Sequence, residues 1–334
     1  MINKKIHYII SIGLIVIGLS VFLYPWIFDM PKVLDWNYAN LQKIKKQEIA
    51  GDSFNFAIFG DNKNSVFAFP KLIKKVNEQN ISFSAETGDL IDNMIDGKSE
   101  YKIYLSQIAK LKKPFLTVPG NHETEGMSSA YYYLFGKNYY AFSYKNSYFL
   151  MLDGSHETGM GNEEMHWLGN ELKKSQKYKH VFALMHIPIY DPLKGEVVKS
   201  QFDKKPAKDL YDLFSKYHID MIFTAHLHGY FTGKWGNIPY TVTGGAGAEL
   251  GGSDPKHFFH HFVLVKVNGD NVSYEVKKVG NNSNTLVAQF INNVKEFVTM
   301  YLLAHWDLFL VIIGLLYLLI YSCIIRRRDV RNHN

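Results

Sequence analysis

The chain has 334 residues and a formal net charge of +6 at neutral pH, a length that allows one large domain or two small ones. The basic residues form no dense stripe in the middle of the chain, so we expect no nucleic-acid binding. The single cysteine, Cys323, lies in an apolar stretch near the C-terminus, which excludes a disulfide framework and thiolate chemistry for the rest of the chain.

Both ends of the chain carry long uncharged apolar segments. Residues 8–28 contain no charged side chain and are long enough to cross a hydrocarbon core of about 30 Å as a helix. A cleaved signal peptide is the alternative, but the apolar run is longer than a typical signal core and no small-residue cleavage site follows it. Residues 308–325 are also uncharged and predict a second transmembrane helix over 307–325, with a buried core helix as the alternative.

Basic residues flank these two segments on their outer sides. Lys4 and Lys5 precede the first, and three arginines at 326–328 follow the second. The positive-inside rule therefore predicts cytoplasmic termini, a two-span protein of the cell membrane and an extracytoplasmic domain between the spans. The predicted order is a cytoplasmic N-terminus (1–7), a transmembrane helix (8–28), a polar connector (29–50), a domain (51–283), a juxtamembrane amphipathic segment or simple stalk (284–306), a transmembrane helix (307–325) and a cytoplasmic basic tail (326–334).

From residue 54, short apolar runs alternate with amphipathic helical patterns. The helical pattern at 69–80, for example, places Leu72, Ile73 and Val76 on one face. Strand-and-turn patterns at 54–61, 81–89 and 115–123 are separated by helical patterns at 69–80 and 100–113. This order is typical of a parallel sheet with right-handed crossovers.

The second half of the domain contains further strands. The sequence "NGD" at 268–270 predicts a hairpin that joins the last two. The predicted elements are a hairpin at 139–153, a helix at 162–175, and strands at 179–186, 219–226, 238–245, 257–267 and 271–279. Residues 191–209 carry few patterned apolar positions and predict a loop or lid. The chain is therefore predicted to be α/β, with a mixed second sheet.

Polar clusters follow five of the predicted strands. They are "GD" at 60–61, "GD" at 88–89, "GNHE" at 120–123, His186, and "HLH" at 226–228. Open α/β sheets bind ligands at the carboxyl edge of their strands, so these clusters can converge. Their mixture of oxygen and nitrogen ligands suits manganese, iron or zinc better than magnesium or calcium. The number of ligands fits two ions that share a carboxylate.

The ordered motifs "GD" (60–61), "GDLID" (88–92), "GNHE" (120–123), His186 and "AHLHG" (225–229) resemble the calcineurin-like metallophosphoesterases, which include the purple acid phosphatases. The resemblance covers roughly residues 54–280 and implies a β-sandwich of two mixed sheets flanked by helices. It also implies two divalent or trivalent metal ions. The implied ligands are Asp61 and His228 for the first ion, Asn121, His186 and His226 for the second, and Asp89 as the bridge. His122 is implied as a general acid for the leaving oxygen, or as a group that stabilises charge on the phosphoryl group.

One position departs from the family pattern. The family usually has Asp-x-His in its first motif, where this chain has Asp61-Asn62-Lys63, and a protonated lysine has no lone pair for a metal. Asp92 stands where purple acid phosphatases supply a tyrosine, so it is one candidate to fill the gap; it can alternatively support His122. Lys63 can instead contact a substrate phosphate, or mark a weakened or single-metal site.

These motifs predict a metal-dependent phosphoesterase in which a metal-bridging hydroxide attacks phosphate esters outside the membrane. His156 is a further candidate substrate contact. The alternative is a non-catalytic protein of the membrane that binds metal or phosphate. The expected partners are a phosphate-ester substrate and the lipid bilayer, and no obligate protein partner is inferred.

Overall fold

The computed structural model describes residues 4–27, 35–47, 51–93, 97–125, 128–193, 201–280 and 286–332. The chain divides into two units, a domain over 33–296 and a helical unit made of 1–32 with 297–334.

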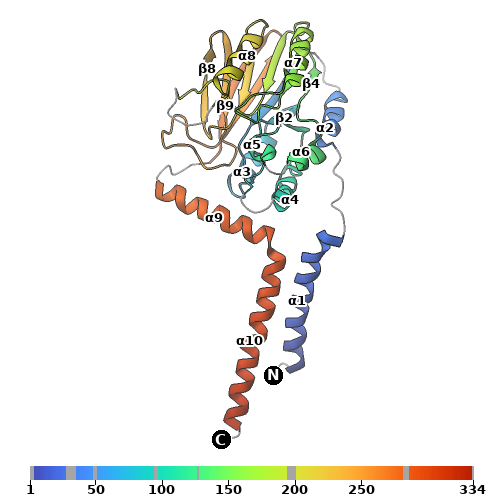
Figure 1. The fold of residues 1–334 in the computed structure, drawn as a ribbon, viewed down its shortest axis with the longest axis vertical. Helices are drawn as coiled ribbons and strands as arrows, with labels where there is room; N and C mark the ends of the chain where they lie inside the picture. Colours follow the sequence, from blue (N-terminus) through green and yellow to red (C-terminus); the bar gives the residue numbers. More distant parts are fainter. Residues whose placement is uncertain are drawn as a thin grey trace. The chain divides into compact units, whose positions relative to one another are not determined.

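The domain contains two mixed sheets (Figure 1). The first has the order β11-β10-β1-β2-β3, in which β1, β2 and β3 are parallel and β10 runs antiparallel to β1. Its strands are β1 (Phe54–Phe59), β2 (Phe83–Glu86), β3 (Phe115–Thr117), β10 (His261–Asn268) and β11 (Asn271–Lys278). The hairpin predicted at "NGD" joins β10 to β11 and is confirmed.

The second sheet has the order β4-β5-β6-β7-β9-β8, with β5, β6, β7 and β9 parallel. Its strands are β4 (Tyr140–Tyr144), β5 (Ser147–Met151), β6 (His180–Leu184), β7 (Met221–Thr224), β8 (Tyr230–Trp235) and β9 (Ile238–Thr243). The sequence pattern missed β8, because its exposed residues 232–234 interrupt the apolar alternation.

Aromatic side chains fill the space between the two sheets. Phe56 on β1 stacks on Phe83 of β2, with ring centroids 5.3 Å apart, and packs edge-on against Phe149 and Phe182 of the second sheet. Alternate residues of β1, Ala57 and Phe59, belong instead to the core on the other face of the first sheet. The period-two pattern of the strand thus divides its side chains between two cores.

Helices cover the outer faces of both sheets. Those beside the first sheet are α3 (Ala68–Asn77), α4 (Gly97–Ile108) and α6 (Ser128–Phe135), and those beside the second are α7 (Asn162–Ser175) and α8 (Lys204–Phe214). A single-turn helix, α5 (Asn121–Thr124), follows β3. The result is the α/β fold with two mixed sheets that the sequence predicts.

The loop predicted at 191–209 is wrong in its last part. Residues 204–209 begin α8, whose buried face continues to Phe214, and residues 194–200 lie outside the described part of the chain. The helix was missed because its first turn is charged and its apolar residues are widely spaced.

The segment predicted as a polar connector contains α2 (Trp36–Lys45). Its side chains bind the edge of the first sheet: Trp36 Nε1 donates to Phe115 O at 2.9 Å, and Asn37 Oδ1 accepts from Thr117 N at 2.9 Å. This helix therefore packs as part of the domain and supplies hydrogen bonds that the edge strand β3 lacks on one side.

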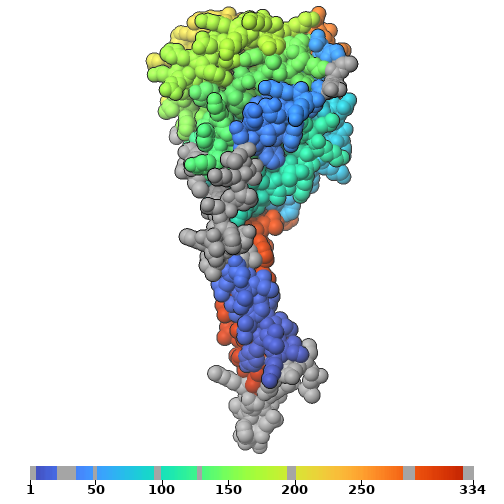
Figure 2. Space-filling view, turned by 90° about the vertical axis from the view of Figure 1, so that its right-hand side faces the viewer, coloured from blue at the N-terminus to red at the C-terminus, as the bar shows by residue number. Residues whose placement is uncertain are grey.

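The helical unit contains α1 (Lys4–Ile27) and α10 (Trp306–Asn332), which α9 (Leu286–Ala304) precedes. α1 and α10 lie side by side and antiparallel (Figures 1 and 2): the His7 ring stacks on Tyr321 with centroids 4.3 Å apart, and Ser11 Oγ donates to Gly314 O at 2.5 Å. A Cβ on Gly18 would meet Val311 Cγ2 at 2.7 Å, so small residues bring the helices together.

Among the described residues, one helical segment, Trp306–Ile325, is long and apolar enough to cross a membrane by length and composition. The apolar helical segment near the N-terminus, Lys5–Ser20, is shorter than a helix needs to be to cross a membrane. The length of this segment therefore does not support the predicted span over 8–28. Residue 28 and the side chains of 21–27 lie outside the described part of the chain.

Candidate metal centre

The first two candidate residues are brought together by the turns that follow neighbouring parallel strands. Asp61 follows β1 and Asp89 follows β2, and the Asp61 N–H donates to Gly88 O at 3.1 Å. A Cβ on Gly60 would meet Thr87 Oγ1 at 2.3 Å, so only glycine permits these two turns to approach so closely.

The backbone is left-handed at many of the candidate residues. The φ angles are 57° at Asp61, 43° at Lys63, 56° at Asp89, 71° at His226 and 40° at His228. Such angles are uncommon for residues other than glycine and cost of order 1–3 kcal/mol each, so they persist where the surrounding structure enforces them. Their concentration at one edge of two sheets is typical of a functional site.

His186 has a defined orientation and protonation state. Its Nδ1 lies 2.8 Å from Thr87 O, a carbonyl that can only accept, so Nδ1 carries the proton and Nε2 presents a lone pair. Burial lowers the pKa of this ring to about 4, so it is neutral near pH 7. Nε2 lies 3.0 Å from Asn121 Oδ1 and 3.2 Å from Asp89 Oδ1. Three acceptors therefore face one another.

His226 completes this group. Its Nδ1 lies 3.1 Å from Asn121 Oδ1 and 3.2 Å from His186 Nε2. Ligand atoms about 2.1 Å from one ion and at right angles to each other are about 3.0 Å apart. The spacing of these atoms is that of ligands around a single cation. We call the atoms of Asp89, Asn121, His186 and His226 the second ligand set.

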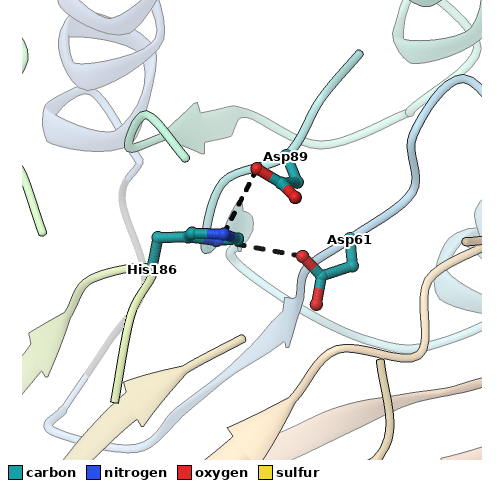
Figure 3. A group of neighbouring side chains, drawn as sticks. All are labelled: Asp61, Asp89 and His186. Atoms are coloured by element: carbon teal, nitrogen blue, oxygen red, sulfur yellow. Dashed lines mark ion pairs between the residues drawn. The ribbon is translucent and has the colours of Figure 1, made fainter. Parts of the chain in front are cut away.

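Asp61 is fully buried, and neither of its oxygens accepts a hydrogen bond of normal geometry within the described part of the chain. Burial and the neighbouring Asp89 raise the pKa of its carboxyl well above its usual range. A buried carboxylate without donors favours a nearby cation. Ligand atoms of Asp61, Asp89 and His186 lie within 4.8 Å of one another (Figure 3).

His228 presents its Nε2 in the same way as His186. Its Nδ1 lies 2.7 Å from the carbonyl oxygen of Glu249, so Nε2 is left as the electron-pair donor. Burial and the Lys63 ammonium lower the pKa of this ring to about 3, which keeps it neutral. The sequence predicts that His228 binds a metal ion together with Asp61 and Asp89, and we call these three candidate ligands the first ligand set.

Lys63 lies beside the first ligand set. Its Nζ is 3.7 Å from Asp89 Oδ2 and 3.6 Å from Asp92 Oδ1, and its side chain is 16% exposed. Burial alone would lower the pKa of Lys63, but the carboxylates of Asp89, Asp92 and Asp61 raise it above its ordinary value. The side chain is therefore an ammonium ion within a group of carboxylates.

His122 stands at the open side of the group, with its side chain 24% exposed. Its Nδ1 lies 2.9 Å from the backbone oxygen of Asp92, and its Nε2 lies 3.8 Å from Asp89 Oδ2. The ring is thus fixed by one nitrogen, which leaves Nε2 able to face a ligand. Asp92 orients His122 through its backbone and faces Lys63 with its carboxylate.

Sequence reasoning missed the buried acids that hold these loops. Glu123 accepts hydrogen bonds from the backbone N–H groups of Asp89, Leu90, Ile91 and Gly120, at 2.7–3.1 Å. Glu100 Oε2 accepts from Asp92 N and Asn93 N at 2.8 and 2.9 Å. The only signal for Glu123 was its place in "GNHE".

Glu86 is a third such acid, and it holds the turn after β1. Its Oε1 accepts from Asn62 Nδ2 at 2.6 Å, and its Oε2 accepts from the Tyr104 hydroxyl at 2.8 Å. Its signal in the sequence was an acid that ends an otherwise uncharged strand. Together with Glu123 and Glu100 it fixes the backbone on which the candidate ligands stand.

His156 is not brought into this group. It is exposed in the loop after β5, and within the described part of the chain its ring makes no hydrogen bond or ion pair with the candidate ligands. A cleft of about 820 Å³ opens nearby, lined among others by Tyr132, Tyr133 and Asp153. One of its lining residues, Asp153, precedes Gly154, whose backbone oxygen accepts from Ile187 N at 2.9 Å.

The family model described as "Calcineurin-like phosphoesterase" matches residues 54–230, more than half of the chain. Among curated proteins, the chain is 24% identical over 152 residues to the rat serine/threonine-protein phosphatase CPPED1, covering 41% of this chain and 49% of that protein. It is 26% identical over 242 residues to mouse acid phosphatase type 7, covering 58% and 54%. The chain thus spans about half the length of the curated relatives it matches.

Solved structures share the fold. The purple acid phosphatase PPD1 from yellow lupin (Lupinus luteus) superposes with a TM-score of 0.54 at 19% identity, over 68% of this chain and 51% of that one. A dimetal phosphatase from Danio rerio superposes with a TM-score of 0.55 at 14% identity, over 68% and 97%. With the family model spanning most of both sheets and all the strand-end motifs up to "HLH", the chain belongs to the calcineurin-like phosphoesterases.

Proposed function

We propose that the protein is a metal-dependent phosphoesterase that hydrolyses phosphate esters outside the membrane. The observation that carries this proposal is the second ligand set, in which acceptor atoms of Asp89, Asn121 and His186 face one another at 3.0–3.2 Å. A cation among three buried acceptors would stabilise their close approach. Manganese, iron or zinc fits the mixed oxygen and nitrogen ligands.

A metal ion bound here would lower the pKa of a water molecule and neutralise phosphoryl oxygens. The chain's own residues supply the rest. His186 is held in one tautomer by Thr87, and Glu123 fixes the turn that carries Asp89. His122, with Nδ1 engaged by the Asp92 carbonyl, can deliver a proton from Nε2 to the departing oxygen. The sequence predicts two metal ions. The Lys63 ammonium lies beside Asp89, a member of the first ligand set.

The location proposed is the outer face of the cell membrane, with both termini cytoplasmic and helices over 8–28 and 307–325 as anchors. Support for the second anchor is the apolar segment Trp306–Ile325. Support for the first is its packing: α1 contacts α10 from His7 to Gly18, through Ser11, so a membrane that surrounds α10 also surrounds this part of α1.

The rival function is a non-catalytic binder of metal or phosphate, favoured by the ion pairs that Lys63 makes beside the first ligand set. The two functions differ in turnover. A binder would retain metal or phosphate without releasing alcohol from any ester, whereas the proposed enzyme releases it.

The proposal is tested on the full-length protein in detergent, loaded with manganese, iron or zinc and supplied with aryl phosphomonoesters and diesters. We expect hydrolysis of at least one ester class. D89N and H226A should lose both bound metal and activity, because each removes a member of the second ligand set. H166A serves as the control, since His166 is an exposed histidine on α7. Absence of hydrolysis with every metal would contradict the enzymatic function, and full activity in D89N would contradict the site.

A further inference from the structure

Lys63 is held rigidly, unlike most surface lysines. Its backbone N–H donates to Asp89 O at 3.0 Å, and its φ of 43° fixes the direction in which the side chain leaves the chain. The asparagines on either side are buried. Asn62 donates to Glu86 Oε1 at 2.6 Å, and Asn64 donates to the backbone oxygen of Glu100 at 2.8 Å. The ammonium is therefore placed by the fold.

The surroundings of Lys63 are those of the first ligand set. Its Nζ lies 3.7 Å from Asp89 Oδ2, the oxygen that does not face His186, and 3.6 Å from Asp92 Oδ1. Asp61 and His228, the other members of the set, also interact with its charge. An ammonium ion thus lies beside the carboxylate that both ligand sets share, and it has no lone pair to offer a metal ion.

Charge balance favours the ammonium over a second ion. When all three are ionised, the carboxylates of Asp61, Asp89 and Asp92 carry three negative charges, which one dication in the second ligand set and the Lys63 ammonium together neutralise. A second dication would add two positive charges within a few ångströms of that ammonium, in a site largely closed to water. Moving the Lys63 ammonium away would also leave the carboxylates of Asp89 and Asp92 without the positive charge that pairs with them, which is unfavourable for partly buried groups.

We propose that Lys63 replaces the first metal ion, so that the protein works with one metal ion and one built-in ammonium. The inference rests on the proposed phosphoesterase function. In this arrangement two of the three ammonium donors face Asp89 and Asp92, and the third binds a phosphoryl oxygen of the substrate. The Asp61 oxygens, which accept no hydrogen bond of normal geometry within the described residues, would accept from a water molecule in the site.

Metal stoichiometry tests this without relying on catalysis. The full-length protein is saturated with Mn²⁺, freed of excess ion and measured by elemental analysis, with electron paramagnetic resonance to detect coupled pairs. We expect one ion per chain and no coupled spectrum for the wild type. K63H, which removes the ammonium and supplies a ligand, should bind two ions and give the coupled spectrum. K74H is the matched control, because Lys74 is exposed on α3, and it should bind one ion.

A second measurement uses inorganic phosphate as the probe. K63M keeps the length of the side chain without its charge, and it should raise the dissociation constant of phosphate at least tenfold. K63R should change that constant by less than about threefold, because the positive charge is kept. Equal phosphate affinity in K63M and the wild type would overturn the inference even where K63H fails to fold.

The outcomes separate this inference from the proposed function. Two ions per wild-type chain, together with ester hydrolysis, would overturn the replacement by Lys63 and leave the phosphoesterase function standing. One ion in both the wild type and a folded K63H would overturn it as well, because Lys63 would not be what excludes the second ion. No bound ion in the wild type would contradict both.

Discussion

The contacts that hold His122 indicate the role of its side chain. One ring nitrogen is fixed by the Asp92 carbonyl at 2.9 Å, the backbone N–H binds Asp89 Oδ1 at 3.2 Å, and the other ring nitrogen stands at the open side of the ligand sets. A histidine ring with a purely packing role is usually buried on all sides, whereas the His122 side chain is partly exposed. The arrangement suits proton delivery to a leaving oxygen.

We expect H122N to lower kcat about 100-fold to 10,000-fold for an alkyl phosphate, whose leaving oxygen needs a proton. The loss should be much smaller for para-nitrophenyl phosphate, whose leaving group departs without one. Steady-state kinetics on both esters checks this, with H166A as the control. Equal losses for the two esters would contradict a role as general acid.

For single residues, the sequence predicted which side chains gather at the site better than it predicted how those side chains are oriented. The motif "HLH" placed His226 and His228 on the same edge as His186. In the structure His226 lies beside His186, and a Cβ on Gly244 would meet both Asp61 and the backbone of His228. It could not predict that His226 faces the group through Nδ1 and His228 through Nε2, because that depends on left-handed backbone angles and on the Glu249 carbonyl.

The ion pair between Lys63 and Asp92 could not be predicted from the sequence either. It depends on the Glu100 carboxylate, which accepts from Asp92 N and so positions the turn that carries Asp92. Glu100 lies in a helix that follows this turn, and nothing in the local pattern marks it as a support for the site.

At the scale of elements, α3 depends on a residue from a distant helix. The residue before α3, Phe67, provides no side-chain cap. Ser65 Oγ accepts from Ala68 N, the first residue of α3, at 2.9 Å. Glu296 on α9 in turn accepts from Ser65 Oγ at 2.7 Å, Val66 N at 2.8 Å and Phe67 N at 3.3 Å. A carboxylate at this position meets both the unpaired N–H groups and the positive end of the helix dipole.

We expect E296A to lower the free energy of unfolding by about 1–2 kcal/mol, which is the usual effect of losing a helix cap. Amide hydrogen exchange at Val66 and Phe67 should accelerate most. Both are measured on the full-length protein, with K295A as the control because Lys295 is exposed next to Glu296. Unchanged exchange at these two amides would show that the contact contributes nothing to the start of α3.

Helix α7 carries a buried acid in its first turn. Glu164 Oε1 accepts from Asp153 N at 2.8 Å, and burial raises the pKa of its carboxyl to about 8. Between about pH 4.5 and pH 8 the folded chain therefore keeps a proton that the unfolded chain has lost. Because the folded state binds more protons there, stability from this group is fully present below about pH 4.5 and is lost as pH rises through 8.

We therefore expect E164Q to flatten the pH dependence of stability. For the wild type, this group contributes a decrease of up to about 1.4 kcal/mol per pH unit across that window. The glutamine keeps an acceptor for Asp153 N but cannot ionise. Urea denaturation at about pH 5, 6.5 and 8 checks the difference between the two proteins. Parallel curves would contradict the assignment of a raised pKa.

At the scale of the whole molecule, the fold class could be predicted because both sheets leave clear patterns. Buried parallel strands such as β6 appear as short apolar runs, and the paired strands β10 and β11 surround a strong turn signal. The sequence pattern did not predict two elements, β8 and α8, and each has a physical reason. β8 is half exposed, and α8 follows a stretch with few apolar residues.

The proposed topology can be tested by cysteine labelling, since Cys323 is the only native thiol. In a C323S background, K256C places a thiol at an exposed position of the domain, and N334C places one at the end of the chain. A membrane-impermeant maleimide should label K256C in intact cells and N334C only after permeabilisation. The reverse pattern would show that the domain faces the cytoplasm.

The neighbour of β1 in the first sheet has a consequence for biogenesis. β1 carries Asp61 at its end, and on one side it pairs with β10, in the register Phe54 opposite Val267. During synthesis, β1 therefore has only half of its hydrogen-bonding partners until about 200 further residues have been made, which at about 5–20 residues per second takes of the order of 10–40 s. In the proposed topology, the first sheet is therefore completed only once β10 has reached the outer side of the membrane.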